Sequence, residues 1–155
     1  MLPSNLINEA RILNKCDVTS KKRLLETLAE LLAKARPDLL PDSIFERLLE
    51  RERLGSTGLG YGMALPHARV DDITIPVGAF VQLESGVDFD AIDDQPVDLA
   101  FALLVPQAAD EHHLQLLASL AEMFNQPTLR QQLREGNSES ELFDALTGWA
   151  ATADT

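Results

Sequence analysis

The fold class follows most directly from residues 97–105, Val97-Asp98-Leu99-Ala100-Phe101-Ala102-Leu103-Leu104-Val105. A strand with one solvated face alternates apolar and polar residues, whereas an almost continuous apolar run is typical of a strand covered on both faces. A second β-rich run, Ile73 to Leu83, precedes it and is interrupted by Pro76 and Gly78. The segment between the two, Glu84 to Pro96, is acidic and turn-forming. These runs predict a buried sheet.

Amphipathic helices are expected before the strands. Residues 20–35 place apolar side chains on one helical face: Leu24, Leu25, Leu28, Leu31, Leu32 and Ala35. Thr19 or Ser20 is the expected N-cap of this helix, and Pro37 closes it. A second helix is expected from Asp42 or Ser43, with a capping box formed by Ser43 and Glu46, and must end by Gly55.

Helices are also expected after the strands. One begins at Asp110-Glu111, with an apolar face made of Leu114, Leu117, Ala118, Ala121 and Phe124. Two further helical pieces follow, and the last opens with a Ser138/Glu141 capping box and buries Leu142, Phe143, Leu146 and Trp149. Helices on both sides of the strands predict a single layered α/β domain over residues 1–150. Residues 151–155 are expected to form a frayed tail.

Composition excludes several function classes. The chain has 155 residues, and 13 Lys+Arg against 25 Asp+Glu give a net charge of -12. This charge removes the electrostatic driving force for binding nucleic acid or an anionic membrane. No apolar run approaches the roughly 20 residues of a membrane span, and the N-terminus does not resemble a signal peptide, so a cytoplasmic location is expected. The single cysteine, Cys16, excludes an internal disulfide and a CxxC site.

A glycine-rich segment leads to one histidine. Residues 55–62 contain four glycines in eight positions, which predicts a loop or an unusually open strand. His67 follows directly after Pro66, whose fixed φ sets how the chain enters this position. His67 is therefore either an accessible, pre-aimed imidazole or a surface histidine at a strand end.

The other two histidines, His112 and His113, open the helix that begins near residue 110. Adjacent helical residues point about 100° apart, so both are not expected at one site, and a first-turn histidine lies near backbone N–H groups that attract an anion. A zinc site made of His67, one of this pair and Asp110 is a weaker alternative, because the spacing matches no common zinc motif. No metal or other cofactor is expected.

Groups that bind phosphate precede His67. They are the arginines Arg51 and Arg53, the hydroxyls of Ser56 and Thr57, and the backbone amides of Gly58, Gly60 and Gly62. Arg47, Arg51, Arg53 and Arg69 bracket His67, whereas residues 70–129 hold eleven acidic residues and no Lys or Arg. The arginines form a basic collar around a phosphohistidine site, or they pair with Glu46, Glu50 and Glu52 along a helix.

These residues resemble a known family. The pattern Arg51-Glu52-(x3)-Ser56-Thr57-x-x-Gly60-x-Gly62-x-Ala64-x-Pro66-His67 is similar to the active-site signature of mannitol/fructose-type enzyme IIA domains of the bacterial phosphotransferase system. Gly55-Ser56-Thr57-Gly58 and Ala64-Leu65-Pro66-His67-Ala68-Arg69 resemble its nitrogen-regulatory branch most. The similarity also includes Val87-Asp88-Phe89-Asp90-Ala91, Gln95-Pro96-Val97-Asp98-Leu99 and His113-Leu114-x-x-Leu117.

The resemblance implies a fold and a set of site residues. The fold is a three-layer α/β/α domain, in which a mixed β-sheet lies between helices. His67 would be the phosphorylated nucleophile, His113 would stabilise the phosphoryl group, and Arg51, Ser56 and Thr57 would bind phosphate. At one position the chain departs from the family, since Tyr61 stands where a smaller polar residue is common.

The resemblance also implies a function. An HPr-like phosphocarrier would phosphorylate His67, and the phosphorylation state would control regulatory target proteins such as potassium-transport or sensor-kinase proteins. The chain would then be a phosphoryl carrier with a phosphohistidine intermediate, regulatory rather than plainly enzymatic. The alternative is a sugar-transport enzyme IIA that passes phosphate to a IIB component. The absence of a membrane run and of a IIB-like cysteine loop around Cys16 favours the regulatory function.

Overall fold

The computed structural model describes residues 3, 5–108 and 111–153. Its centre is one sheet of six strands in the order β1-β5-β6-β3-β2, with β4 also paired to β6. The strands are β1 (Ile12–Cys16), β2 (Gly58–Gly60), β3 (Met63–Ala64), β4 (His67–Val70), β5 (Val77–Val87) and β6 (Val97–Pro106). β6 runs antiparallel to β5 and parallel to β3 and β4. The sheet is therefore mixed, as the resemblance implied.

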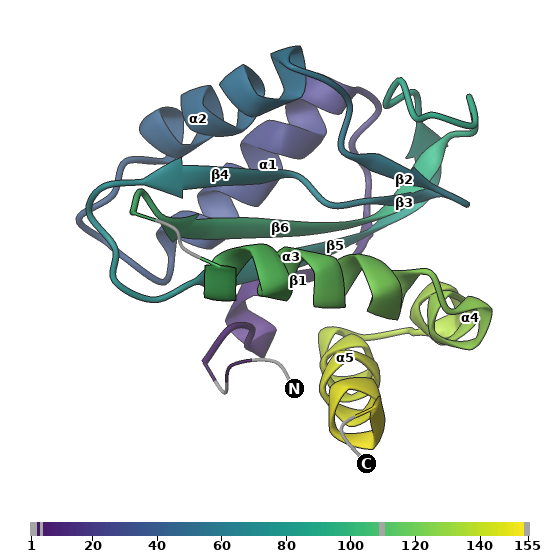
Figure 1. Cartoon of the computed structure of the whole chain (residues 1–155). Coiled ribbons are helices and arrows are strands. Elements are labelled where there is room, and N and C mark those ends of the chain that lie inside the picture. The colour runs from purple at the N-terminus through teal and green to yellow at the C-terminus, as the bar shows by residue number, and fades with distance from the viewer. Residues whose placement is uncertain (1–2, 4, 109–110, 154–155) are drawn as a thin grey trace.

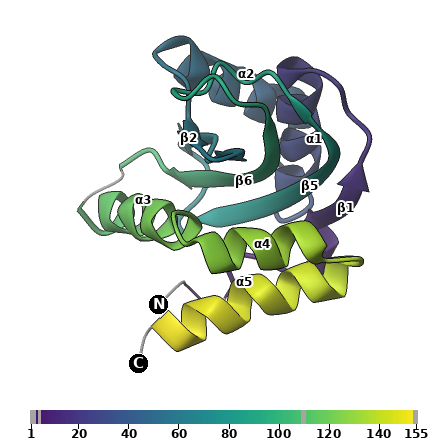
Figure 2. The same ribbon diagram turned by 90° about the vertical axis from the view of Figure 1, so that its right-hand side faces the viewer.

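Helices cover both faces of this sheet (Figures 1 and 2). The helices are α1 (Lys21–Ala33), α2 (Pro41–Arg53), α3 (Glu111–Phe124), α4 (Pro127–Glu135) and α5 (Glu139–Ala153), with a short 3-10 turn η1 (Glu9–Arg11) before β1. α1 and α2 lie on one face, and α3, α4 and α5 lie on the other. The three-layer α/β/α prediction is confirmed.

Strand β6 contributes to two separate cores. Ala100, Ala102 and Leu104 belong to the cluster under α1 and α2, whereas Phe101 and Leu103 belong to the cluster under α3, α4 and α5. Successive side chains of a strand point to opposite faces, so a strand between two helix layers must be apolar at every position. This confirms the interpretation of the apolar run that ends at Val105.

The helix predictions were correct in number and partly wrong in detail. Ser20 caps α1 by accepting from the Arg23 N–H at 3.1 Å, as expected. The capping box at Ser43 was wrong: α2 begins at Pro41, with Leu40 as its N-cap and no side-chain cap. Proline suits the first helical position because its missing N–H has no partner to lose there.

The predicted apolar face of α3 was partly wrong: Phe124 is buried and Leu117 and Ala121 pack against the core as expected, but Leu114 and Ala118 do not face it. The buried residues are Leu116, Leu120, Met123 and Phe124, whereas Leu114 is 57% exposed. Leu116, Leu120 and Met123 were not expected in this face, so the buried face includes more residues than predicted and excludes Leu114. At the start of α5, Ser138 does accept from the Glu141 N–H at 3.1 Å, as the capping box required.

Some strands were not expected from the sequence. β1 was missed, and β5 ends at Val87, four residues beyond Leu83. β3 and β4 pair with consecutive parts of β6, and Leu65-Pro66 separates them. These strands are too short to show a period of two, which is why their pattern is not visible in the sequence. Residues 58–60 of the glycine-rich segment are a strand, and the following residues, Tyr61 and Gly62, turn with positive φ values of 57° and 81°.

Helix α5 extends past the expected end of the domain. α5 continues to Ala153, three residues past the expected domain end at 150, while residues 154–155 of the predicted frayed tail lie outside the described residues. None of the helices in the described part of the chain is long and apolar enough to cross a membrane.

Candidate functional site

His67 is the first residue of β4, and its backbone is held by pairing with β6. The Leu103 N–H donates to the Pro66 carbonyl at 2.9 Å, and His67 lies opposite Leu103 in the parallel register with β6. Because Pro66 has a fixed φ and no N–H, the chain breaks its pairing just before His67 and resumes it there. The imidazole therefore projects from the junction between two strands, on a rigid base.

The ring of His67 has a defined tautomer. Nδ1 lies 2.9 Å from the Leu65 carbonyl oxygen. A carbonyl only accepts hydrogen bonds, so the proton is assigned to Nδ1 and Nε2 carries the lone pair. Burial lowers the pKa of His67 below its ordinary value, the charges of Arg51 and Arg69 lower it further, and the Leu65 contact and Glu52 oppose the shift. The ring is thus held neutral, the state a nucleophile needs.

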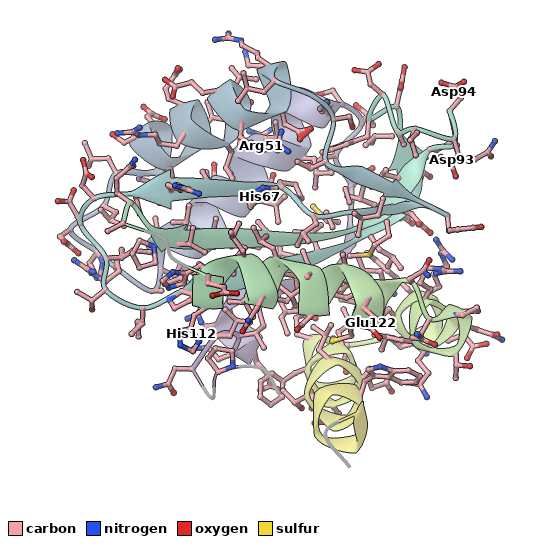
Figure 3. All side chains as sticks on the ribbon, in the orientation of Figure 1. Arg51, His67, Asp93, Asp94, His112 and Glu122 are labelled. Carbon is pink, nitrogen blue, oxygen red and sulfur yellow. The ribbon has the colours of Figure 1, made fainter. Side chains whose placement is uncertain are left out.

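An open pocket of about 410 Å³ lies beside His67. Four segments line it: α2 with Arg47, Glu50, Arg51 and Leu54, β4 with His67, Ala68 and Arg69, the end of β6 with Val105 and Gln107, and α3 with His113, Leu114 and Leu117. The structure brings together three of the predicted site residues, His67, His113 and Arg51. Figure 3 shows Arg51 projecting from α2 above His67.

The arginines of the predicted collar divide into two groups. Arg47, Arg51 and Arg69 line the pocket, while Arg53 does not. Arg51 donates through Nη1 to the Gly55 carbonyl at 2.9 Å, which fixes one arm of its guanidinium at the end of α2. A guanidinium has five N–H donors in a planar fork, so the other donors remain for an anion in the pocket.

Ser56 and Thr57 lie outside the lining of this pocket. The Ser56 hydroxyl donates to the Phe89 carbonyl at 3.0 Å and accepts from the Gly58 N–H at 3.1 Å. Thr57 is buried, and its hydroxyl donates to the Glu52 carboxylate in a short hydrogen bond. Both hydroxyls therefore have partners within the protein. The phosphate contacts expected of Ser56 and Thr57 stay predictions.

The adjacent histidines His112 and His113 lie in different environments, as expected from their spacing. His113 is half-buried and lines the pocket, whereas His112 is exposed and is not among the lining residues. In Figure 3, His112 lies at the start of α3 on the side away from His67. Asp110, the carboxylate of the alternative zinc site, lies outside the described residues. Within residues 3, 5–108 and 111–153, no group of three or more His, Cys, Asp or Glu side chains could hold a metal ion.

Tyr61 is not part of the pocket at His67. Its N–H donates to Asp93 at 2.9 Å, its ring is covered by the Arg130 guanidinium at 4.6 Å, and its carbonyl accepts from Arg134. Arg134 in turn forms a two-pronged pair with Asp98. The bulky residue at this position therefore leaves access to His67 unchanged.

Sequence reasoning missed Gln107, Leu54 and Glu52 as residues of the site or its support. Gln107 and Leu54 follow the ends of β6 and α2, and no spacing or motif marks them. Glu52 differs from these two residues because it lies within the signature. It is only 7% exposed, and a buried acidic residue must have partners. Its place inside the signature was the only signal in the sequence.

The chain is similar to known proteins over most of its length. Residues 5–148 match the family model described as phosphoenolpyruvate-dependent sugar phosphotransferase system, EIIA 2. A nitrogen regulatory protein from Pseudomonas aeruginosa is 47% identical over 127 residues, which cover 82% of each chain. One from Escherichia coli is 43% identical over 152 residues, 97% of this chain and 93% of the relative. The crystal structure of nitrogen regulatory protein IIA-Ntr from Neisseria meningitidis superposes with a TM-score of 0.85 at 40% identity, covering 91% of this chain and 96% of the other.

Proposed function

The chain belongs to the EIIA 2 family of the phosphoenolpyruvate-dependent sugar phosphotransferase system, and we propose that it is a regulatory phosphoryl carrier of the nitrogen type. His67 accepts a phosphoryl group from an HPr-like phosphocarrier, and the phosphorylation state controls the binding of target proteins. The nitrogen regulatory proteins that resemble the chain over most of its length support the regulatory assignment.

The observation that carries the proposal is the state of the His67 ring. Nδ1 is engaged with the Leu65 carbonyl at 2.9 Å, so the lone pair is on Nε2, and the ring borders a pocket that also holds Arg51 and His113. A neutral imidazole with an oriented lone pair is the acceptor that transfer between two histidines requires.

The transfer step makes one phosphorus–nitrogen bond and breaks another. Nε2 of His67 attacks the phosphorus in line, and the donor imidazole leaves with the electron pair of the broken bond. His67 keeps its Nδ1 proton, which the Leu65 carbonyl continues to accept, so positive charge on the phosphorylated ring is stabilised. Arg51, with support from His113, faces the equatorial oxygens, where charge-assisted hydrogen bonds are strongest.

The family resemblance indicates the class of the regulatory target proteins and not an individual target. Potassium-transport and sensor-kinase proteins are the expected partners, and they would sense the local charge at His67. Phosphorylation adds about -1.5 to -2 charges within a collar formed by Arg47, Arg51 and Arg69, so the local change is large even though the chain already carries -12. The alternative, a sugar-transport enzyme IIA, would pass the same phosphoryl group to a IIB component.

One experiment tests the phosphoryl-acceptor assignment. The wild type and His67→Gln are incubated with enzyme I, an HPr-like carrier and phosphoenolpyruvate, and acid-labile labelling is measured. The proposal expects stoichiometric labelling of the wild type and none of the variant, and equal labelling of both would refute it. Transfer of the label onward to a IIB component from the same cell would support the transport alternative over regulation.

A further inference from the structure

Glu52 is a buried carboxylate with no place in the pocket lining. Its side chain is 3% exposed and lies 3.1 Å from the Lys21 ammonium through Oε1. The Thr57 N–H reaches both carboxylate oxygens, at 3.1 and 3.0 Å, and the Thr57 hydroxyl donates to Oε2. Burying a charge is costly unless it is paired and hydrogen-bonded, and here both oxygens are occupied by donors.

A continuous series of hydrogen bonds runs from this carboxylate to the reacting ring. Thr57 donates to Glu52, and the Thr57 carbonyl accepts from the Leu65 N–H at 3.0 Å. The Leu65 carbonyl then accepts from Nδ1 of His67 at 2.9 Å. Leu65 is flanked by Ala64 and Pro66, which contact β6, and its own N–H is held by Thr57, so Thr57 contributes to the position of the carbonyl that orients His67.

The backbone of Glu52 belongs to the turn that holds Arg51. The turn from Glu52 to Thr57 contains Gly55, whose N–H donates to the Glu52 carbonyl at 3.1 Å and whose own carbonyl accepts from Arg51 at 2.9 Å. The Glu52 carboxylate, by binding Thr57, therefore closes a six-residue turn over residues 52–57, directly after Arg51. Within this turn the Gly55 carbonyl accepts from Arg51, and at its end Thr57 is linked through Leu65 to His67.

We propose that Glu52 is a positioning residue for phosphoryl transfer, acting through Thr57 and Leu65 to fix the Nδ1–H tautomer and direction of the His67 ring. This inference rests on the proposed function, because it assigns a role in that same transfer. It also gives Thr57 a different role from the phosphate contact that the family resemblance implied. Lys21 completes the arrangement as the cation that pairs with the buried carboxylate, and it lies 4.4 Å from the centre of the Phe89 ring.

The chemistry of Glu52 makes its replacement by glutamine informative. The Lys21 ammonium and the Thr57 N–H approach Oε1, while the Thr57 N–H and hydroxyl approach Oε2. An amide has one NH₂ group that only donates, so in either orientation Glu52→Gln places a donor against a donor. The change keeps the shape of the side chain while removing the arrangement that holds Thr57.

Four variants test the proposal. Glu52→Gln and Thr57→Val are expected to slow phosphoryl transfer to His67 by about 10- to 100-fold, the scale of loss when a reacting group is misplaced. Thr57→Ser keeps the hydroxyl and should restore the rate to near the wild-type value. Glu46→Gln is the matched control, because it removes the same charge from an exposed position on α2, and its rate should stay within about twofold.

A second readout does not depend on transfer. NMR of the imidazole nitrogens in the unphosphorylated protein reports which one carries the proton, and thermal unfolding confirms that each variant is folded. The wild type should show protonated Nδ1, whereas Glu52→Gln and Thr57→Val should show an increased share of protonated Nε2. Glu52→Gln should also lower the pKa of His67 further, since the charge of Glu52 raises it.

The outcomes separate this inference from the proposed function. If folded Glu52→Gln and Thr57→Val keep both the wild-type tautomer and the wild-type transfer rate, Glu52 has only a structural role and the inference is wrong. If the wild type accepts no phosphoryl group, the proposed function fails, while the tautomer measurement still tests the series of hydrogen bonds. An altered tautomer in Thr57→Ser equal to that in Thr57→Val would also overturn the inference.

Discussion

Replacing Arg51 with methionine should slow phosphoryl transfer to His67 substantially. Arg51 lines the pocket of His67, and one arm of its guanidinium is already fixed to Gly55, so little freedom is lost when the other donors meet an anion. A hydrogen bond to a charged group contributes about 1.5–3 kcal/mol. If Arg51→Met loses one such bond in the transition state, transfer should slow by about 10- to 100-fold. Methionine keeps an apolar stem of similar length, which limits packing loss.

The assay is a single-turnover transfer from the phosphorylated HPr-like carrier, with excess acceptor and rapid quenching. Arg53→Met is the matched control, since Arg53 lies on the same helix, is exposed and is absent from the pocket lining. The pKa of His67 should also be higher in Arg51→Met than in the wild type, because the charge of Arg51 lowers it. The reasoning is refuted if Arg51→Met and Arg53→Met both transfer at the wild-type rate while His67→Gln is inactive.

Four further predictions concern pH and stability. The pKa of His67 is lowered by burial, so the transfer rate should fall only when pH drops below the ordinary histidine value of about 6.5. Between this ordinary value and the lowered pKa of the folded protein, His67 binds more protons in the unfolded chain than in the folded one. The free energy of unfolding of the wild type should therefore rise with pH across this range relative to that of His67→Gln. A difference in unfolding free energy between the two proteins that does not change with pH would contradict this prediction. Gln82 is 4% exposed and donates to the carbonyls of Leu133 at 2.8 Å and Gly136 at 2.9 Å. Gln82→Leu should therefore lower the free energy of unfolding in urea by about 2–3 kcal/mol. The control Gln132→Leu, at an exposed position, should not show this loss. Gly62 has φ +81° and its added Cβ would lie 2.6 Å from Asp98 Oδ1, so Gly62→Ala should lower the unfolding midpoint without reducing transfer to His67; an unchanged midpoint would show that the turn relaxes.

The layer order of the fold was predictable because burial leaves a strong trace in composition. A strand that contacts two cores, as β6 does through Phe101 on one side and Ala102 on the other, must be apolar at every position, and the sequence shows this. The short strands β3 and β4 leave no such trace. They form because two short segments, one before and one after Pro66, pair with β6. Pairing between residues so far apart in the chain is not visible in the local pattern of apolar residues.

The register of α3 shows a second limit. Leu114 and Leu117 were expected to face the core. Leu117 does pack against it, whereas Leu114 is 57% exposed and lines the pocket near His67. An exposed apolar residue looks the same in sequence as one in the core. The helix was therefore predictable, and the direction of its first turn was not.

The candidate site was predictable where residue type and chemistry coincide. Histidine after proline, with arginines nearby, indicated a phosphoryl acceptor, and His67, Arg51 and His113 do meet at one pocket. Sequence alone could not show that Thr57 turns inward to Glu52, because that contact depends on how the chain folds back after α2. Nor could it show the Lys21–Glu52 pair, which joins the start of α1 to the end of α2.

The most direct test of the central claim is NMR of the phosphorylated protein with labelled imidazole nitrogens. The account predicts phosphorus–nitrogen coupling to Nε2 of His67, with the proton retained on Nδ1 against the Leu65 carbonyl. Coupling to Nδ1 of His67, or a phosphoryl group on His113 instead, would contradict it.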